Sequence, residues 1–250
     1  MYFCEKRKTK EFKSMKIDVC TSPALYSFYK KEGDIVIVVD IFRATTTICA
    51  AFTNGAGSII PVANIEEAKR YKSKGYLVGA ERNTQKCDFA DFGNSPFEYK
   101  ASIVDGKDIV FTTTNGTHAI ESAQGCKELY IGAFSNMHNL VEKCAKKTER
   151  IVVICSGWNN RINLEDTLFA GAFVEEMKLR TMVEADSDAL LIALNLWISA
   201  KENPLQFVKV SEHYRRLQLH GFEDEAEYCL TQNTTTVVPY YDIKNKLLRV

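Results

Sequence analysis

Short apolar runs recur along this chain, and polar or helix-spaced segments separate them. The clearest runs are residues 34–39 (DIVIVV), 107–111 (KDIVF) and 150–154 (RIVVI). Short runs rich in Val and Ile, without polar alternation, are typical of strands buried on both faces of a sheet. Weaker runs predict further strands at residues 16–20, 57–62, 76–79 and 128–131.

Segments with helical spacing follow most of these strands. We expect helices over residues 45–52, 64–71, 136–146 and 164–180, with Asn64 and Asn163 as N-caps. In the last third we expect helices over residues 189–200, 203–220 and 223–230, followed by a short apolar end. Strands that alternate with helices indicate an α/β fold with a mainly parallel sheet.

Two segments of the chain echo one another. Residues 34–47 (DIVIVVDIFRATTT) and 108–117 (DIVFTTTNGT) each join an apolar strand to a threonine triplet. This echo suggests two similar lobes within residues 15–250, with no clear boundary between them.

Charge and composition narrow the class of protein. The 250 residues include 46% hydrophobic ones and carry a net charge of zero, which argues against a nucleic-acid partner. Residues 1–14 are basic and lack an apolar core, so we expect either a disordered leader or a chain start at Met15 rather than a secretory signal. No apolar run is long enough to cross a membrane.

The eight cysteines are scattered singly and form no CxxC motif. In a chain without a secretory signal such cysteines are expected to be reduced thiols, and the expected compartment is the cytoplasm. A homodimer is expected only because most soluble enzymes form one.

Four polar clusters fall just after predicted strands: Asp40–Thr47, Glu81–Asn83, Thr112–Thr117 and Cys155–Trp158. In open parallel sheets, ligands bind at the carboxyl ends of the strands. Hydroxyls and Gly-Asn turns at such ends suit a phosphate. Scattered single acids suit Mg²⁺, which takes one or two carboxylates together with substrate phosphate.

The first cluster combines an acid, a base and hydroxyls. Asp40 either holds Mg²⁺ or attacks phosphorus, Arg43 neutralises phosphate oxygens, and Thr45 and Thr46 donate hydrogen bonds. Structural explanations stay open for the same residues: Asp40 as a helix cap and Arg43 as part of a surface ion pair.

Structural explanations also stay open for the other clusters. Thr113 to Gly116 can be only a turn and cap, and Asn163 to Asp166 only a capped helix start. Cys155 is either a thiolate nucleophile or, as we prefer, a small buried hydrophobic residue. None of the four histidines has metal spacing, and His118 alone is expected near a candidate site.

Several common motifs are missing from the sequence. It contains no Walker A, GxGxxG or HExxH motif, and Phe42 stands where a haloacid-dehalogenase-type DxD motif needs its second Asp.

A set of motifs, in order, resembles the 2-phosphosulfolactate phosphatase (ComB-like) family. The matching pieces are VVDIFRATTT (38–47), GAERN (79–83), DFGNSPFEY (91–99), TTTNGTHAI (112–120), CSGW (155–158), NLEDTLFAGAFV (163–174) and the closing AEYCL and VVP. Together they cover almost everything from Met15 onward. The resemblance implies a three-layer α/β/α fold with two similar lobes. It also implies Mg²⁺-dependent hydrolysis of 2-phospho-3-sulfolactate, a step of coenzyme M biosynthesis in organisms that make it.

The resemblance also implies a site. Asp40, Glu81 and Asp166 are the expected metal ligands, with Asp40, Arg43 and Asp166 in catalytic roles. The expected substrate-binding and phosphate-binding residues are Thr45, Thr46, Arg82, Asn94, Ser95, Thr113, Thr114, Asn115, Gly116, Thr117 and Arg161. Two alternatives stay open: a lyase or transferase that uses the same phosphate cradle, and a non-catalytic protein that binds a phosphorylated ligand.

Overall fold

The computed structural model describes residues 14–185 and 187–250 of the chain. The predicted basic leader, residues 1–14, therefore lies outside the described residues apart from Ser14. Among the described residues, no helix is long and apolar enough to cross a membrane.

The described chain forms one sheet of eleven strands. The strands are β1 (Met15–Cys20), β2 (Ile35–Val39), β3 (Ser58–Pro61), β4 (Leu77–Arg82), β5 (Gln85–Lys86), β6 (Asp108–Thr112), β7 (Glu128–Gly132), β8 (Ile151–Cys155), β9 (Val183–Glu184), β10 (Tyr240–Asp242) and β11 (Leu247–Arg249). Their spatial order is β5-β4-β6-β3-β11-β10-β7-β2-β8-β1-β9.

Helices separate most of these strands along the chain. They are α1 (Tyr26–Tyr29), α2 (Ala44–Thr53), α3 (Ile65–Ser73), α4 (Ala101–Val104), α5 (Gly116–Ser122), α6 (Met137–Cys144), α7 (Leu164–Lys178), α8 (Asp188–Ala200), α9 (Pro204–Val208), α10 (Glu212–Leu219) and α11 (Glu223–Leu230). Short 3-10 turns form η1 (Pro23–Leu25), η2 (Pro96–Glu98) and η3 (Phe134–Asn136). The predicted α/β class with a mostly parallel sheet is confirmed.

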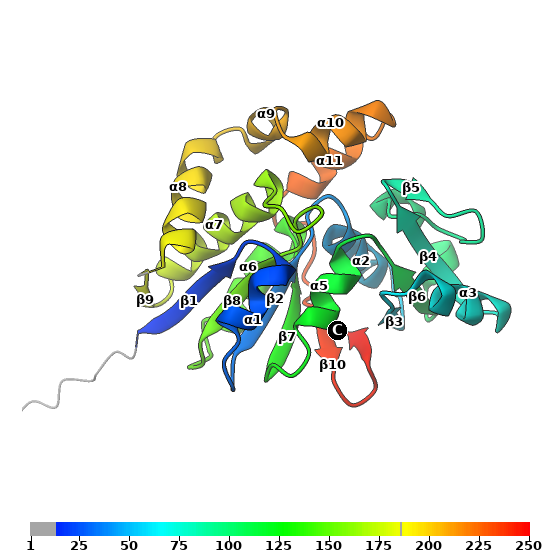
Figure 1. Cartoon of the computed structure of the whole chain (residues 1–250), viewed down its shortest axis with the longest axis horizontal. Coiled ribbons are helices and arrows are strands. Elements are labelled where there is room, and N and C mark those ends of the chain that lie inside the picture. The colour runs from blue at the N-terminus through cyan, green and yellow to red at the C-terminus, as the bar shows by residue number, and fades with distance from the viewer. Residues whose placement is uncertain (1–13, 186) are drawn as a thin grey trace, which may run out of the picture.

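The sheet consists of two parallel groups of strands. The first group holds β9, β1, β8, β2 and β7, and the second holds β3, β6 and β4, with the short antiparallel β5 at its edge. An antiparallel hairpin, β10–β11, lies between the groups and pairs with β7 on one side and with β3 on the other. Figure 1 shows the two groups to the left and right of this hairpin. Whether they are duplicated lobes stays a prediction.

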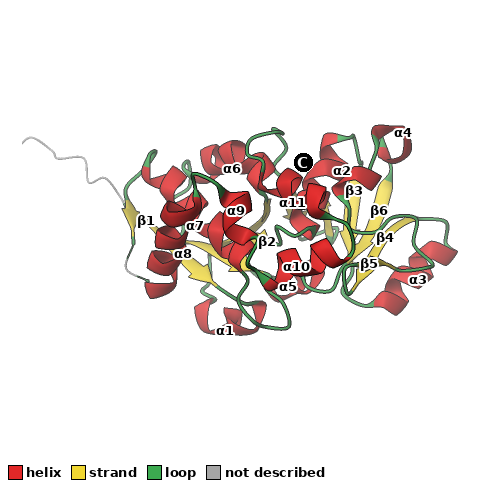
Figure 2. Cartoon of the chain, turned by 90° about the horizontal axis from the view of Figure 1, so that it is seen from above, coloured by secondary structure: helices red, strands yellow, loops and turns green. Residues whose placement is uncertain are grey.

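Strand β2 is buried on both faces, as its apolar run predicts. Its odd-numbered side chains, such as Ile37, pack with residues of α6 and α7 including Leu140 and Phe169. Its even-numbered side chains, such as Val38, pack with Tyr26 of α1 and Ile120 of α5. Helices therefore cover both faces of this group, and in Figure 2 α6 and α1 lie on opposite sides of the sheet.

The two groups run in opposite directions through the sheet, because three antiparallel pairings separate β3 from β7. The carboxyl ends of β2 and β6 nevertheless meet, since Gly116, four residues beyond β6, lies against Asp40, which directly follows β2. Neighbouring strands rotate by about 20–25° each, so the pairings between β6 and β2 accumulate roughly 100–125° of twist. Twist, rather than a common sheet edge, brings these strand ends together.

Three local predictions are wrong. The helix expected over residues 203–220 is two helices, α9 and α10, because Ser211 starts a new helix by accepting a hydrogen bond from Tyr214 N. The strand expected over 76–79 extends to Arg82, so Glu81 lies within it. Asn163 precedes α7 but makes no side-chain cap, since its Nδ2 donates to Glu165 Oε1 at 2.9 Å. By contrast, Asn64 caps α3 as expected, accepting from Glu66 N at 2.8 Å.

Candidate active site

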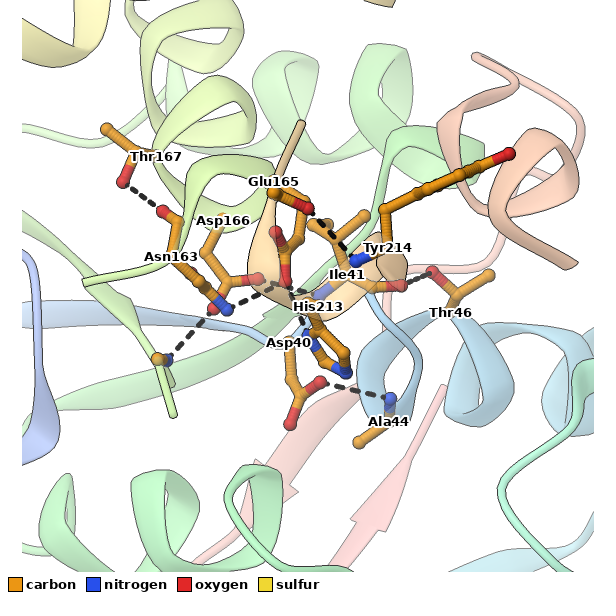
Figure 3. Close-up of polar contacts among 12 residues, drawn as sticks. Asp40, Ile41, Ala44, Thr46, Asn163, Glu165, Asp166, Thr167, His213 and Tyr214 are labelled. Carbon is orange, nitrogen blue, oxygen red and sulfur yellow. Dashed lines mark hydrogen bonds and ion pairs between the residues drawn. The ribbon is translucent and has the colours of Figure 1, made fainter. Parts of the chain in front are cut away.

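Two buried carboxylates, Asp40 and Asp166, form the centre of the candidate site. Asp40 directly follows β2, and Asp166 lies in the first turn of α7. Asp166 accepts hydrogen bonds from Ile41 N at 2.8 Å and from Gly157 N at 3.1 Å. These bonds tie the loop after β2 to the loop after β8 and fix the orientation of Asp166 (Figure 3).

Both carboxyl groups hold their protons more tightly than ordinary aspartic acids. Burial, and then the charge of Asp166, raise the pKa of Asp40 to about 8. Burial, and then the charge of Glu165, raise the pKa of Asp166 to about 7. Asp40 Oδ1 accepts a long hydrogen bond, 3.4 Å, from Ala44 N. Two buried acids with so little compensating positive charge provide a place for a cation.

The second group of strands contributes Glu81 and the turn after β6. Glu81 accepts hydrogen bonds from Thr84 N, and from the amide and hydroxyl of Thr114 at 3.3 Å and 3.2 Å. Its charge also contributes to raising the pKa of Asp40. A Cβ on Gly116 would lie 3.0 Å from Asp40 Oδ2 and 3.3 Å from Thr113 Oγ1. The structure therefore brings together Asp40, Asp166, Glu81 and residues 113–116.

Two residues near this centre carry unpartnered hydroxyls. Thr113 Oγ1 and Ser156 Oγ are buried without a hydrogen-bond partner among the described residues. Ser156 directly follows β8, and its N–H donates to Val39 O beside Asp40. Buried polar atoms seldom stay unpaired, so these two hydroxyls are available to a ligand or to water. Thr117 Oγ1 instead donates to Thr113 O at 3.0 Å and so stabilises the turn.

His213 of α10 also reaches the site, a position that sequence reasoning missed. Its Nδ1 lies 2.6 Å from Glu165 Oε1, and the pair is buried. In Figure 3, His213 lies between Glu165 and Asp40. An imidazole held by a carboxylate beside a reacting group is suited to proton transfer. No local motif marks His213, and His118, the histidine expected near the site, is exposed and lies 3.7 Å from Glu121.

The guanidinium of Arg43 has partners within the protein. It forms a buried ion pair with Glu225 of α11, its Nη2 donates to Thr84 O at 3.0 Å, and its guanidinium lies 4.5 Å from the ring centre of Phe222. Because this pair is buried, it differs from the surface ion pair that was the structural explanation considered for Arg43. Glu225 was not predicted, because it lies on a helix without a recognisable motif.

The predicted threonine donors of α2 are used locally. Thr45 Oγ1 donates to Asp40 O at 3.0 Å, and Thr46 Oγ1 donates to Ile41 O at 3.1 Å. Their hydroxyl hydrogens stabilise the loop that carries Asp40 in this structure, and their predicted role in binding phosphate stays a prediction.

The remaining predicted residues are more scattered. Arg82 donates to Thr112 Oγ1 at 2.9 Å and to backbone carbonyls. Ser95 caps η2 by accepting from Phe97 N, whereas Asn94 Oδ1 is buried and unpartnered. Asn115 lines a cavity of about 490 Å³ together with Ser156. Arg161 is largely exposed and lies 3.4 Å from Glu212. None of these contacts tests a role in substrate binding, which stays a prediction.

Cys155 matches the preferred structural interpretation. It is fully buried, and burial, together with the charge of Asp166, raises the pKa of its thiol well above the ordinary value. A thiol in these surroundings stays protonated, so the residue packs as a small hydrophobic side chain.

Two of the three expected magnesium ligands, Asp40 and Asp166, are buried carboxylates that would suit a cation, and the magnesium site itself stays a prediction. In the part of the chain that the structure describes, no three His, Cys, Asp or Glu side chains are grouped to hold a metal ion. Asp40 and Asp166 nevertheless form a buried acidic pair whose raised pKa values a cation would reverse. Mg²⁺ commonly uses one or two carboxylates with substrate phosphate. Glu81, the third expected ligand, is occupied by hydrogen bonds from Thr84 and Thr114.

Comparisons with known proteins agree with the motifs. The family model described as 2-phosphosulpholactate phosphatase matches residues 20–244. A protein of Thermotoga petrophila, named probable 2-phosphosulfolactate phosphatase, is 40% identical over 203 residues, covering 81% of this chain and 87% of its own. Proteins with the same name from Caldanaerobacter subterraneus subsp. tengcongensis (36% identity, 86% and 89% covered) and Clostridium novyi (33% identity, 91% and 97% covered) are also similar.

Proposed function

Because the chain belongs to the 2-phosphosulfolactate phosphatase family, we propose that it hydrolyses 2-phospho-3-sulfolactate, or a similar small anionic 2-hydroxy acid phosphate, to the hydroxy acid and inorganic phosphate. The observation that carries the proposal is the pair Asp40 and Asp166, buried at the meeting point of two strand ends with unpartnered hydroxyls beside it.

Different residues of the chain have different roles in this reaction. Asp40 and Asp166 would hold Mg²⁺, which when bound neutralises phosphoryl oxygens as a Lewis acid. The unpartnered hydroxyls of Thr113 and Ser156 donate hydrogen bonds to phosphoryl oxygens. The backbone amides of Ile41 and Gly157 keep Asp166 in one orientation, so the acid pair needs little rearrangement when substrate arrives.

The His213–Glu165 pair supplies the proton to the leaving group. Glu165 accepts at His213 Nδ1, which leaves the other ring nitrogen for the leaving alkoxide oxygen of the substrate. The charge of His213 also contributes to lowering the pKa of Asp40, which favours the carboxylate form of that residue.

Phosphate release tests the proposal directly. Purified protein is given 2-phospho-3-sulfolactate with Mg²⁺ or with EDTA, beside Asp40→Asn. We expect one phosphate and one 3-sulfolactate per substrate, release that EDTA abolishes, and a variant slowed by at least about 100-fold, the order of effect for lost transition-state electrostatics.

The alternatives give different results in the same assay. A transferase needs an acceptor before phosphate leaves the substrate, and a lyase yields an unsaturated acid instead of 3-sulfolactate. A non-catalytic binding protein holds the substrate tightly and releases no phosphate. Acid quenching with phosphorus-32-labelled substrate then decides whether Asp40 carries the phosphoryl group or only supports the metal.

A further inference from the structure

A cavity of about 390 Å³ lies beside the His213–Glu165 pair. Its walls come from the loop after β8, the start of α7, and α10. Glu165 and His213 line the cavity and also lie next to the acid pair, so the cavity adjoins the candidate active site. Its volume is sufficient for a three-carbon acid.

Arg216 of α10 has an unusual position in the wall of this cavity. Its guanidinium carbon lies 4.0 Å from the ring centre of Trp158, so the group stacks on the indole. Its Nε and Nη2 atoms are buried and have no hydrogen-bond partner among the described residues. These two atoms form one edge of the guanidinium and point their N–H bonds in parallel, the geometry that binds a pair of oxyanion oxygens.

No hydrogen bond joins the neighbouring acids to Nε or Nη2 of Arg216, and Glu165 Oε2 is itself buried without a partner among the described residues. Glu165 Oε1 accepts from His213 Nδ1 at 2.6 Å and from Asn163 Nδ2 at 2.9 Å. Glu212 lies 3.4 Å from Arg161, and both side chains are more than 60% exposed, at 68% and 64%. The Nε and Nη2 donors of Arg216 thus have no partner among the described residues, and native proteins seldom leave two buried donors unpaired without a ligand or ordered water.

Electrostatics connect Arg216 with the active site. Burial lowers the pKa of its guanidinium, and the charges of Glu165, Glu212 and Glu81 act to raise it. Glu81 belongs to the opposite group of strands and also acts on Asp40, so Arg216 lies within electrostatic reach of the reacting centre.

We propose that Arg216, held flat on Trp158, binds the second anionic group of the substrate, a sulfonate or a carboxylate, through its two parallel N–H donors. This inference rests on the proposed function, because it places the phosphoryl group at Asp40 and the other charge of the same molecule in the cavity. It makes Arg216 a determinant of specificity for acids that carry a charge besides phosphate.

The test compares three phosphate esters with the wild type, Arg216→Gln, Arg216→Lys and the matched control Arg215→Gln. Arg215 is the exposed neighbour of Arg216 on α10, so its substitution removes the same charge outside the cavity. The esters are 2-phospho-3-sulfolactate, 2-phospholactate, which lacks the sulfonate, and phenyl phosphate, which lacks both acid groups. Thermal unfolding confirms that each variant is folded.

We expect Arg216→Gln to lower kcat/KM for 2-phospho-3-sulfolactate roughly 10- to 100-fold, the range for a lost charged hydrogen-bonded contact. Phenyl phosphate turnover and the Arg215→Gln protein should be unchanged, and Arg216→Lys should recover only part of the loss, because an ammonium lacks the planar fork. A loss for the sulfonate ester alone assigns the sulfonate to Arg216. An equal loss for 2-phospholactate assigns the carboxylate.

Calorimetry with 3-sulfolactate separates this inference from the proposed function, since it needs no turnover. The wild type could release no phosphate and still bind 3-sulfolactate more tightly than Arg216→Gln does. That result would overturn the proposed phosphatase activity and support the anion site at Arg216. Equal binding by wild type and Arg216→Gln, or an equal kinetic loss for all three esters, would overturn the anion site. A lower Tm for Arg216→Gln without any change in kinetics or binding would also overturn the anion site. Arg216 would then be only a structural partner of Glu165.

Discussion

Gly116 lies so close to Asp40 that a Cβ added to it would be 3.0 Å from Asp40 Oδ2 and 2.7 Å from the Cβ of Ala44. The two residues belong to opposite groups of strands, and they touch where the sheet's twist brings β2 and β6 together. The absence of a side chain at position 116 is therefore part of the geometry of the acid pair.

We expect Gly116→Ala to lower kcat/KM on the order of 100-fold, because a displacement of about 1 Å at a reacting group has effects of that size. The added methyl group has no room unless Asp40 or Ala44 moves. Steady-state kinetics with 2-phospho-3-sulfolactate measures the loss, and a Tm close to that of the wild type shows that the fold persists. Full activity in a folded variant would mean that Asp40 is not held at this contact during the reaction.

The raised pKa of Asp40 predicts how stability depends on pH in EDTA. The folded protein keeps this proton to about pH 8, whereas the ordinary value is 3.8, so the folded state binds more protons across that window. The contribution of this proton to the free energy of unfolding is therefore fully present below about pH 4. It is lost as the pH rises through about 8. The Asp40→Asn variant lacks this ionisation and therefore this loss of stability. The amount by which its Tm exceeds that of the wild type should grow from pH 5 to pH 8 and stay constant above pH 8.

Differential scanning calorimetry with EDTA checks the Asp40 prediction. A fully released proton changes the free energy of unfolding by about 1.4 kcal/mol for each pH unit, which is several degrees in Tm for a chain of this size. Mg²⁺ at pH 8 should raise the Tm of the wild type and leave that of Asp40→Asn nearly unchanged. Parallel pH profiles for the two proteins would contradict the burial of an uncompensated acid.

Cys155 should be dispensable for the reaction. Its thiol is buried with a raised pKa, so we expect Cys155→Ala to keep kcat within about threefold of the wild type, although the small cavity lowers its stability by about 1 kcal/mol. The phosphate-release assay, run beside Asp40→Asn, measures the contrast. Loss of activity in a folded Cys155→Ala protein would restore the thiolate as a candidate nucleophile.

The buried pair of Arg43 and Glu225 should contribute to stability through both partners. Removing one partner of a buried ion pair destabilises a protein by about 3–5 kcal/mol, because the other charge stays buried alone. We expect Arg43→Met and Glu225→Leu each to unfold at much lower denaturant concentration, and the double variant to recover most of the loss. Urea unfolding measures all four proteins.

Activity of the double variant decides what else Arg43 does. If it is stable but inactive, Arg43 acts on the substrate as the sequence motif suggests. If it is stable and active, the pair only anchors α11 to the loop after β2.

His213 should act on the chemical step rather than on binding. We expect His213→Gln to lower kcat about 100-fold with little change in KM, the usual size of general acid catalysis. Glu165→Gln should have a smaller effect, because it loosens the ring without removing it. The readout is the split between kcat and KM, with phenyl phosphate as a second test. Its phenolate leaves more easily than the alkoxide of a hydroxy acid, so it needs less protonation and the variant should lose less activity with it.

Residues near strand ends were predictable from the sequence, since Asp40, Glu81 and Thr113 each lie close to the end of an apolar run. The residues of α10 and α11 were not. His213, Arg216 and Glu225 lie on polar helices whose local pattern says nothing of the residues that they lie against. They approach the site from positions far along the chain, and only the three-dimensional arrangement shows which polar side chains of these helices face inward.

The same limit explains the errors in the fold. The break between α9 and α10 depends on Ser211, whose capping hydrogen bond competes with continuation of the helix and gives only a weak signal in the sequence. The hairpin β10–β11 is short, and its place in the middle of the sheet depends on long-range pairing with Tyr130 and Ile59. Local periodicity contains no information on such partners.

That hairpin is also the last described part of the sheet to be synthesised. On the ribosome, every described strand on either side of it is made before Tyr240–Asp242 and Leu247–Arg249 emerge. Any partial sheets that formed before that point would have unpaired inner edges at β7 and β3, the kind of edge that invites aggregation. The last described strands to be synthesised therefore join the two halves and protect those edges.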